Sequence, residues 1–266
     1  MAESISAGAA RTIVITGAAS GIGAALRALV EAEGDRVIGV DRAGAEVVAD
    51  LATAEGRAAA VAQVLELSGG VVDGAVTCAG LSGVAPVLPL VNYFGTTEVV
   101  VGLHDALAAA EAPRVVLVGS ISGTQPADDT LVAALLAGDE PAAVAATAAV
   151  IEAGKPQQLY PSSKSAVARW ARRTAVEPGW ADAGIAINVV APGVVLTPMS
   201  AGLFADEKMK AIMDAAVPMP LHGYSEAADV ARVIAFLLSA STTHVTGQVV
   251  YVDGGAETTL RGPSRF

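Results

Sequence analysis

Two residues whose types and spacing could carry proton chemistry, Tyr160 and Lys164, lie four positions apart in a stretch typical of a helix. Positions i and i+4 share one helix face, so we expect the phenol and the ammonium to lie together. A nearby positive charge favours the phenolate, so Lys164 should lower the pKa of Tyr160 from its reference value of about 10. Tyr160 would then donate and accept protons near neutral pH.

A glycine-rich loop accompanies this pair. Thr16–Gly23 follows an apolar run and precedes a helix-like segment, with the spacing Gly-x3-Gly-x-Gly. Backbone N–H groups at a helix N-terminus attract phosphates, and glycines let a pyrophosphate approach the backbone. Alone, the loop could be an ordinary turn, but together with Tyr160 and Lys164 it predicts a dinucleotide site. The residues expected to line the turn are Gly17, Ser20, Gly21, Ile22 and Gly23.

The type of dinucleotide depends on Asp41, which ends the second predicted strand eighteen residues after Gly23. A carboxylate there accepts both adenosine ribose hydroxyls and repels a 2′-phosphate. Arg42 could instead hold such a phosphate, and a solvated strand-end Asp41 is the plainer alternative. No basic residue lies within Gly17–Gly23, so we expect NAD.

The order of the elements predicts the fold class. Short β-branched runs alternate with helix-like segments, which is typical of a parallel sheet covered by helices on both faces. We predict an α/β fold, a doubly wound parallel (Rossmann) sheet of about seven strands, in one domain spanning residues 1–266. The expected strands are Thr12–Thr16, Arg36–Val40, Val47–Ala49, Val72–Cys78, Arg114–Gly119, Ala186–Val190 and Gln248–Val252. The expected helices are Gly21–Glu33, Thr53–Leu67, Val91–Ala110, Tyr160–Val176 and Ser225–Leu238, the last with Ser225 as N-cap.

Two segments break this alternation. Only five residues, Arg42–Glu46, separate the second strand from the third, too few for a crossover helix, so an extended return is expected. The second is Thr124–Gly154, where a loop should be short. Its two Ala/Leu-rich runs, Asp129–Ala137 and Pro141–Ala153, predict an inserted pair of short helices.

Composition narrows the function classes. The chain is 53% hydrophobic, yet no apolar run approaches the ~20 residues of a membrane helix, and residues 1–11 lack the apolar stretch of a secretion signal. A net charge of −11 argues against nucleic acid as a partner. The single cysteine, Cys78, fits a reducing compartment, and the three histidines lack ligand spacing. We expect a cytoplasmic protein without a metal site or a nucleic-acid or membrane partner.

On these motifs the chain resembles the short-chain dehydrogenase/reductase family, from Thr12 to Gly255. Thr16–Gly23 is similar to that family's glycine motif. Thr77-Cys78-Ala79-Gly80 stands where the family usually has Asn-Asn-Ala-Gly, which should affect bracing of the sheet more than catalysis. The plain alternative for Cys78 is a small buried hydrophobe.

The resemblance implies a role for each residue that matches the family order. Asn92 would position a water in a proton relay, Ser120 would be the catalytic serine, and Thr197 would bind the nicotinamide carboxamide. Asp50, followed by Leu51, would meet the adenine amine with its side chain. Ser122 is a rival to Ser120 but falls two residues beyond the family's position. Read singly, Asn92, Ser120 and Thr197 could be a helix cap, a turn residue and an N-cap. The implied catalytic residues are Asn92, Ser120, Tyr160 and Lys164. The further implied cofactor contacts are Asp41, Arg42, Asp50, Leu51, Cys78, Ala79, Gly80, Pro192, Gly193, Val195 and Thr197, beside Tyr160 and Lys164.

The implied function is an NAD(H)-dependent oxidoreductase that interconverts a secondary alcohol and a ketone, with Tyr160 as general acid/base. A hydrolase is disfavoured, because the Gly-x-Ser-x-Gly elbow fails at Ile121 within Gly119–Gly123. A non-catalytic NAD-sensing module would tolerate loss of Tyr160 or Lys164, and both are present.

Within the family, the chain is most similar to the bacterial 3α-hydroxysteroid dehydrogenase/carbonyl reductase group. The similarity rests on Val91–Gly95, on Ala49–Arg57 and on an interval of 40 residues between Ser120 and Tyr160. It implies a 3α-hydroxysteroid or 3-ketosteroid as substrate. A general carbonyl reductase and a terpenoid or cyclic alcohol dehydrogenase remain alternatives.

Two further expectations concern the substrate and the assembly. The segment of about Met199–Pro220 should form a lid whose Met-rich wall suits a hydrophobic alcohol or ketone, with ordinary helix packing as the alternative. In the family, the helices carrying Asn92 and Tyr160 commonly form a four-helix interface between subunits. The insertion at about 124–154 should block that surface, so we expect a homodimer, with a tetramer as the alternative.

Overall fold

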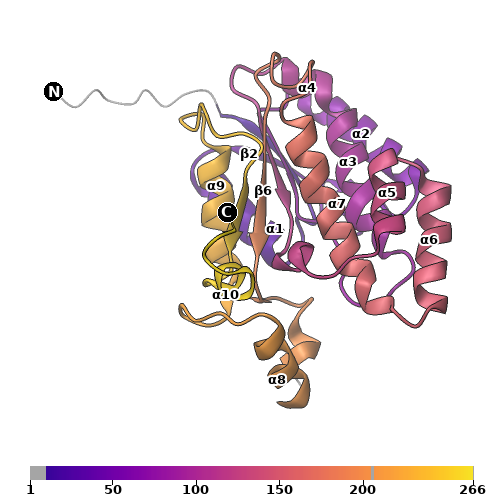
Figure 1. The fold of residues 1–266 in the computed structure, drawn as a ribbon. Coiled ribbons are helices and arrows are strands. Elements are labelled where there is room, and N and C mark those ends of the chain that lie inside the picture. The colour runs from indigo at the N-terminus through magenta and orange to yellow at the C-terminus, as the bar shows by residue number, and fades with distance from the viewer. Residues whose placement is uncertain (1–9, 205–206, 266) are drawn as a thin grey trace.

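A parallel sheet of seven strands, in the order β3-β2-β1-β4-β5-β6-β9, forms the centre of the molecule (Figure 1). The computed structural model describes residues 10–204 and 207–265. The strands are β1 (Thr12–Thr16), β2 (Arg36–Asp41), β3 (Val47–Val48), β4 (Gly74–Thr77), β5 (Arg114–Val118), β6 (Ala186–Pro192) and β9 (Val249–Val252). A separate short pair joins β7 (Val195–Leu196) to β8 (Ser225–Glu226).

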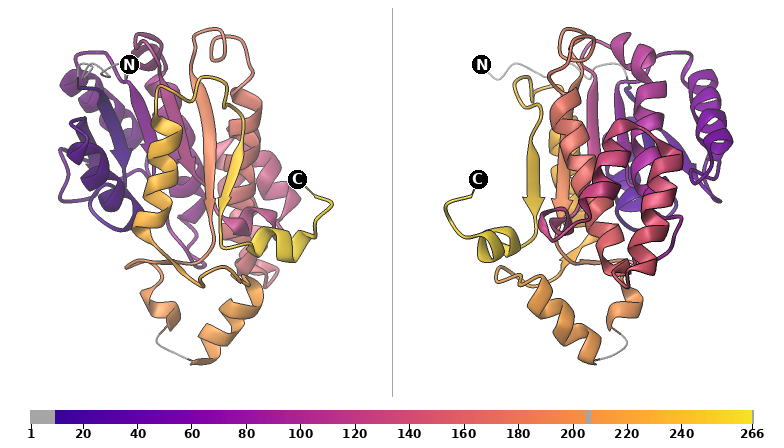
Figure 2. Two further views of the ribbon diagram at one scale, coloured as in Figure 1. Left: turned by 90° about the vertical axis from the view of Figure 1, so that its left-hand side faces the viewer. Right: turned by 45° about the vertical axis from the view of Figure 1, so that its right-hand side comes forward.

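Helices cover both faces of this sheet, which confirms the predicted doubly wound α/β fold (Figures 1 and 2). On one face, α1 (Gly21–Ala32) and α9 (Ala227–Leu238) pack against each other and the strands. On the other face lie α2 (Ala54–Ser68), α3 (Gly95–Gly102) and α7 (Leu159–Thr174). The strands read as continuous apolar runs because both of their faces are buried. The short helix α4 (His104–Ala108) follows α3. The short helix α10 (Ala256–Arg261) follows β9 near the C-terminus.

The strand order reverses at β1, whose neighbours are β2 on one side and β4 on the other. In doubly wound sheets, ligands bind in the crevice outside the carboxyl ends of the strands at such a reversal. The last residues of β1, β2 and β4 are Thr16, Asp41 and Thr77. The fold therefore brings the glycine loop, the strand-end carboxylate and the Thr77–Gly80 segment to one edge of the sheet.

The predicted inserted helices are present as α5 (Asp129–Ala137) and α6 (Glu140–Glu152). Asp128 and Asp139 cap them, since their carboxylates accept the N–H groups of Leu131 at 2.8 Å and Ala142 at 2.9 Å. Helix α5 packs against both α6 and α7. The insertion thus forms an extra layer outside α7, at the right of Figure 1.

The structure corrects three of the predicted helix and strand assignments and confirms the extended return after the second strand. The predicted helix Val91–Ala110 is interrupted, because a π-helical turn at Leu90–Phe94 precedes α3 and a break precedes α4. The predicted strand Val72–Cys78 is shorter, as β4. Ser225 is not the N-cap of α9: it pairs with Val195 in β8, and Glu226 caps the helix. The extended return after β2 is confirmed, since β3 pairs with β2 in parallel.

The predicted lid segment contains a 3₁₀ turn at Ala201–Phe204 and helix α8 (Glu207–Ala216), which projects from the lower end of the sheet (Figures 1 and 2). Residues 205–206 of that segment lie outside the described residues. Within the described ranges, no helix has the length and apolar character needed to cross a membrane. The same ranges contain no group of three or more His, Cys, Asp or Glu residues that could hold a metal ion.

Candidate active site

The loop between β1 and α1 has a backbone that requires glycine. Gly17 and Gly21 have φ angles of +69° and +52°. A Cβ on Gly17 would lie 2.7 Å from the backbone nitrogen of Ala79, and one on Gly23 would lie 2.1 Å from the Gly17 carbonyl oxygen. Ser20 precedes α1 without capping it through its side chain. The helix N-terminus therefore stays open to an anion, which fits a pyrophosphate.

Asp41 holds this loop in place from the end of β2. Its carboxylate accepts the N–H of Ala19 at 3.0 Å and that of Arg42 at 2.7 Å. Arg42 itself is exposed and makes no ion pair within the described residues. The half-buried Asp41 carboxylate thus lies beside the glycine loop, where the ribose of a dinucleotide would be placed.

Asn92 lies fully buried in the π-helical turn, a feature frequent at functional sites. Its side chain accepts the N–H of Leu81 at 2.7 Å and donates to the Leu81 carbonyl at 3.0 Å and to the Ser163 hydroxyl at 3.2 Å. Gly80 lies between Asn92 and Lys164, since a Cβ on Gly80 would be 3.2 Å from Asn92 Oδ1 and 3.9 Å from Lys164 Nζ. Asn92 therefore joins the loop after β4 to helix α7.

Ser163 is a residue of this network that the sequence analysis missed. Its hydroxyl accepts from Asn92 and donates to the Tyr160 carbonyl at 2.8 Å. Its position next to Lys164 was the only available signal, because its contact with Asn92 joins residues 71 apart in the chain.

Ser120 and Tyr160 meet at the carboxyl end of β5. Ser120 Oγ accepts the N–H of Ser122 at 3.1 Å, and the Ser120 hydroxyl favours the ionised form of the Tyr160 phenol. The turn that follows lies directly on α7, because a Cβ on Gly123 would be only 3.2 Å from the Lys164 backbone. Ser120, Tyr160 and Lys164 are thereby brought together, while Ser122 serves the turn.

The pKa of Tyr160 is raised, so the prediction that Lys164 lowers it is wrong for this structure. Burial disfavours the phenolate and outweighs the opposing hydrogen bond from Ser120. Lys164 Nζ lies 5.7 Å from the centre of the Tyr160 ring and donates to the Val118 carbonyl at 2.8 Å. Burial also lowers the pKa of Lys164 to about 8, which weakens any charge it offers to the phenol.

The segment after β6 closes the other side of the crevice. Thr197 lies over the glycine loop, since a Cβ on Gly21 would be 3.4 Å from the Thr197 methyl group. Pro192 and Val195 are buried, and a Cβ on Gly193 would lie 2.9 Å from the sulfur of Met219. The predicted residues after β6 are therefore next to those after β1.

The remaining predicted residues lie around the loops after β3 and β4. Asp50 is exposed and its carboxylate accepts the N–H of Ala52 at 3.0 Å, while Leu51 is buried. Ala79 donates its N–H to the Thr16 hydroxyl at 3.1 Å. Burial raises the pKa of Cys78 to about 12, as expected for an unreactive enclosed thiol. The hydroxyl of Thr77 is buried without a hydrogen-bond partner in the described structure, at a place where the resembled family has an amide.

Comparison with known proteins gives consistent matches over nearly the whole chain. A family model described as enoyl-(acyl carrier protein) reductase matches residues 2–257. The 3-alpha-hydroxysteroid dehydrogenase/carbonyl reductase of Comamonas testosteroni is 38% identical over 259 residues, covering 96% of this chain and 99% of that protein. Galactitol 2-dehydrogenase (L-tagatose-forming) of Cereibacter sphaeroides is 31% identical, covering 91% and 92% of the two chains.

A solved structure agrees with these matches. The crystal structure of the 3-alpha-hydroxysteroid dehydrogenase from Pseudomonas sp. B-0831, complexed with NADH, has a TM-score of 0.89 and 43% identity to this chain. The match covers 96% of this chain and 100% of that one. The chain therefore belongs to the short-chain dehydrogenase/reductase family and is an oxidoreductase.

Proposed function

We propose that this enzyme interconverts a secondary alcohol and a ketone with NAD(H), and that its substrate is a hydrophobic 3α-hydroxysteroid or 3-ketosteroid. The observation that carries the proposal is that the Ser120 hydroxyl favours the Tyr160 phenolate beside buried Lys164, next to an open glycine loop. Two relatives that match over nearly their whole length are named for 3α-hydroxysteroids, which supports the substrate class.

The side chains divide the work as follows. A bound nicotinamide ring supplies or accepts the hydride. Ser120 and Tyr160 hold the substrate oxygen by hydrogen bonds. Because its pKa is raised, Tyr160 is protonated at neutral pH and can donate its proton to the substrate oxygen during reduction. For oxidation, the phenol must first release its own proton toward solvent, and the phenolate then accepts the proton of the alcohol. Lys164 would hold the nicotinamide ribose. Asn92, which joins the loop after β4 to α7, would position the water that relays the proton to solvent.

The roles of Tyr160 and Ser120 are tested by one single variant and one matched pair. Tyr160→Phe should abolish turnover while leaving the dissociation constant for NADH nearly unchanged, since only the proton donor is lost. Ser120→Ala should lose most of kcat, whereas Ser122→Ala, which keeps the backbone N–H that Ser120 accepts, should retain it. Retention of more than a few per cent of kcat by Tyr160→Phe would remove that residue from the role.

The choice of NAD rests on Asp41. Its carboxylate would face the 2′ position of the adenosine ribose, and repulsion of a 2′-phosphate there should favour NAD over NADP at least about tenfold in kcat/KM, or about 1.4 kcal/mol. Asp41→Ala should narrow that ratio. A wild-type preference for NADP would assign recognition to the exposed Arg42 instead.

The substrate class is tested with an NAD-linked activity screen. A cavity of about 560 Å³ lies between the root of the predicted lid and α10, and Val217 and Met219 are among its apolar lining residues. Tyr160 and Ser120 are not part of its lining, so the cavity does not by itself define the substrate site. The screen should cover steroids, terpenoid alcohols, aromatic aldehydes and quinones. Activity on small aldehydes alone would favour a general carbonyl reductase.

We also propose that the enzyme is a homodimer in which the insertion blocks the surface of α7. Helix α5 packs on α7 and buries Leu131, Val132 and Leu135 there, so that face is already covered within one subunit. Light scattering should report a dimer. A tetramer in which the Asn92 and Tyr160 helices pack on their symmetry mates would contradict this.

A further inference from the structure

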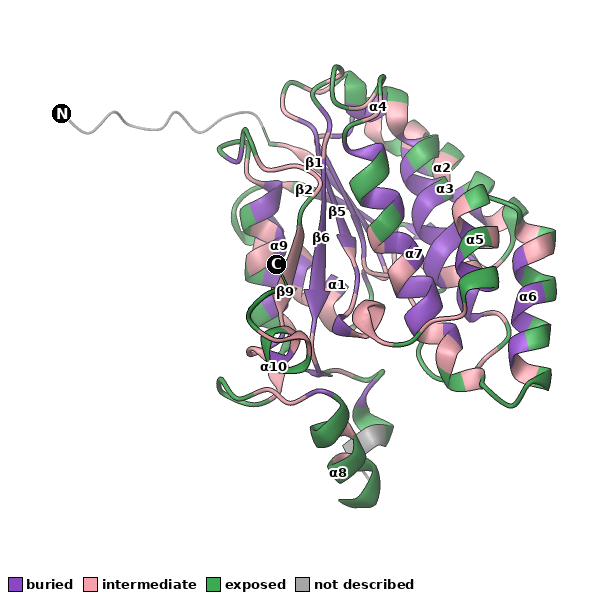
Figure 3. Cartoon of the chain, in the orientation of Figure 1, coloured by how far each residue is buried: buried purple, intermediate pink, exposed green. Residues whose placement is uncertain are grey.

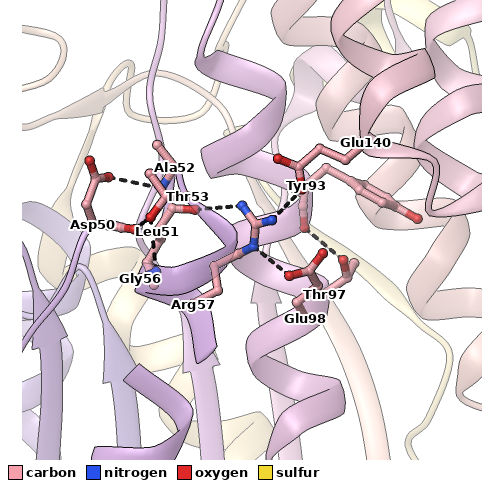
Figure 4. Close-up of polar contacts among 10 residues, drawn as sticks. All are labelled: Asp50, Leu51, Ala52, Thr53, Gly56, Arg57, Tyr93, Thr97, Glu98 and Glu140. Carbon is pink, nitrogen blue, oxygen red and sulfur yellow. Dashed lines mark hydrogen bonds and ion pairs between the residues drawn. The ribbon is translucent and has the colours of Figure 1, made fainter. Parts of the chain in front are cut away.

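Arg57, in the first turn of α2, is among the largest fully buried side chains described, with 1% of its surface exposed. Its guanidinium donates from Nε to Glu98 of α3 at 2.6 Å and from Nη2 to Glu140 of α6 (Figure 4). The third donor, Nη1, lies 3.3 Å from the Leu51 carbonyl oxygen. One side chain therefore contacts three regions that are far apart in sequence.

A buried charge needs this degree of pairing, because removing an ion from water costs several kcal/mol unless partners replace its hydration. Two carboxylates supply the pairing, and the guanidinium also lies 5.6 Å from the centre of the Phe94 ring. Phe94 belongs to the π-helical turn that carries Asn92. The Glu140 carboxylate comes from the first residue of α6, so the insertion takes part in fixing this charge.

The contact with Leu51 links Arg57 to the candidate cofactor site. Leu51 follows Asp50 in the tight turn before α2, where Thr53 caps the helix. Gly56 allows the helix to lie against this turn, since a Cβ there would be 2.0 Å from the Asp50 carbonyl oxygen. Figure 4 shows the turn and the guanidinium side by side. The orientation of Asp50 is thus set by a backbone that Arg57 holds.

We propose that Arg57 and Glu140 are positioning residues for the adenine end of the cofactor site. Glu140, supplied by the insertion, orients the guanidinium of Arg57. Arg57 in turn holds the Leu51 carbonyl and so places Asp50 toward the adenine. This rests on the proposed function and on the family resemblance, which implies that the Asp50 side chain meets the adenine amine of the cofactor. It gives the insertion a role in cofactor binding in addition to its cover of α7.

The test is Glu140→Gln, which keeps the shape of the side chain and removes its charge. The matched control is Glu152→Gln, the same change at the exposed far end of α6. Calorimetry on the full-length enzyme should give an AMP dissociation constant at least about fivefold higher for Glu140→Gln, equivalent to about 1 kcal/mol. Glu152→Gln should match wild type. The kcat at saturating NADH should stay within about twofold, because the nicotinamide end is untouched.

A further variant, together with the melting temperature, separates positioning of Asp50 from mere stabilisation of the fold. Arg57→Lys keeps a charge but cannot reach Leu51 and both carboxylates as a planar fork does, so it should weaken AMP binding like Glu140→Gln. An equal melting temperature with weakened AMP binding supports positioning. Wild-type AMP affinity in Glu140→Gln, with or without a lower melting temperature, overturns the inference and leaves the proposed function intact. Absence of NADH and AMP binding in the wild type overturns both.

Discussion

Two helical segments extend beyond the sheet, the insertion α5–α6 and helix α8 of the predicted lid, and they differ in how they pack. Six apolar residues of the insertion are buried in the main core: Leu131, Val132, Leu135, Ala143, Ala146 and Val150. Helix α8 has no buried residue, and Met209 and Ile212 on it are 41% and 60% exposed (Figure 3). Apolar side chains are present in both segments, so apolar content alone does not make a segment part of the core.

The electrostatic contacts differ in the same way. The insertion is joined to α2 and α3 through the buried guanidinium of Arg57. The lid is joined to the segment after it by an exposed cluster of Lys210, Asp214 and Tyr224, which we name the lid cluster. Exposed ion pairs contribute little to stability, whereas a buried charge is strongly destabilising when its partner is lost. We infer that the insertion is rigid and that the lid can move on ligand binding.

The largest expected effect is on amide hydrogen exchange. Amides of α5 and α6 should exchange at least about a thousandfold more slowly than those of α8, because local opening of an unpacked helix costs far less than global unfolding. Exchange followed by mass spectrometry on the ligand-free enzyme measures this. Comparable protection from exchange in α5–α6 and in α8 would contradict the inference that the insertion is rigid and that α8 can move.

The next effect concerns packing. Leu135→Ala removes a side chain with no exposed surface and should cost about 2–5 kcal/mol of the free energy of unfolding. Ile212→Ala on α8 should change it by no more than about 0.5 kcal/mol. Urea denaturation of both variants tests the pair. A large loss for Ile212→Ala would mean that α8 is packed in solution.

The sequence predicts the regular part of this molecule well. Strand Thr12–Thr16 and the helix over Asp129–Ala137 coincide with the structure, because hydrophobic period and turn residues are local signals. The glycine loop was recognisable for the same reason, since its φ angles admit few other residues.

What the sequence could not predict depends on distant contacts. The partners of Arg57 lie 41 and 83 residues away, so an Ala-rich helix gives no sign that this arginine is buried. The pKa of Tyr160 depends on burial and on where the Lys164 ammonium points, which spacing alone does not reveal. Ser225 has the residue type of an N-cap, yet tertiary pairing with Val195 places it in a strand.

The active site beneath the insertion and the region of α8 also differ in how they shift the pKa of a lysine. Burial lowers the pKa of Lys164 to about 8 from 10.5, whereas the hydrogen bond to Asp214 raises that of exposed Lys210. Between pH 8 and 9 the unfolded chain therefore binds more protons at Lys164 than the folded one, and stability should rise with pH by up to about 1.4 kcal/mol per unit. Above pH 9 the raised pKa of Cys78 opposes this rise, because the folded state then keeps the proton.

Urea denaturation at pH 8 and at pH 9 measures this slope. Lys164→Met should flatten this slope. Lys210→Met should leave the slope unchanged, because Lys210 has a raised pKa and is protonated in both the folded and the unfolded state below pH 10.5, so its contribution to stability is constant there. The same slope in wild type and Lys164→Met would show that the ammonium is not buried in solution.

The smallest expected effect tests the lid cluster itself. Asp214 accepts from the Tyr224 hydroxyl and from Lys210 Nζ, the latter at 3.0 Å, and so links α8 to the chain that follows it. Asp214→Asn weakens both hydrogen bonds by removing the charge. Since α8 contributes little to the core, the melting temperature should not change measurably. The KM for a bulky hydrophobic ketone should rise about two- to fivefold, while kcat for a small aldehyde stays constant. Glu207→Gln, the same loss of charge on the same helix, is the matched control. An unchanged KM in Asp214→Asn, or an equal change in Glu207→Gln, would show that the lid cluster does not set the position of α8 during binding.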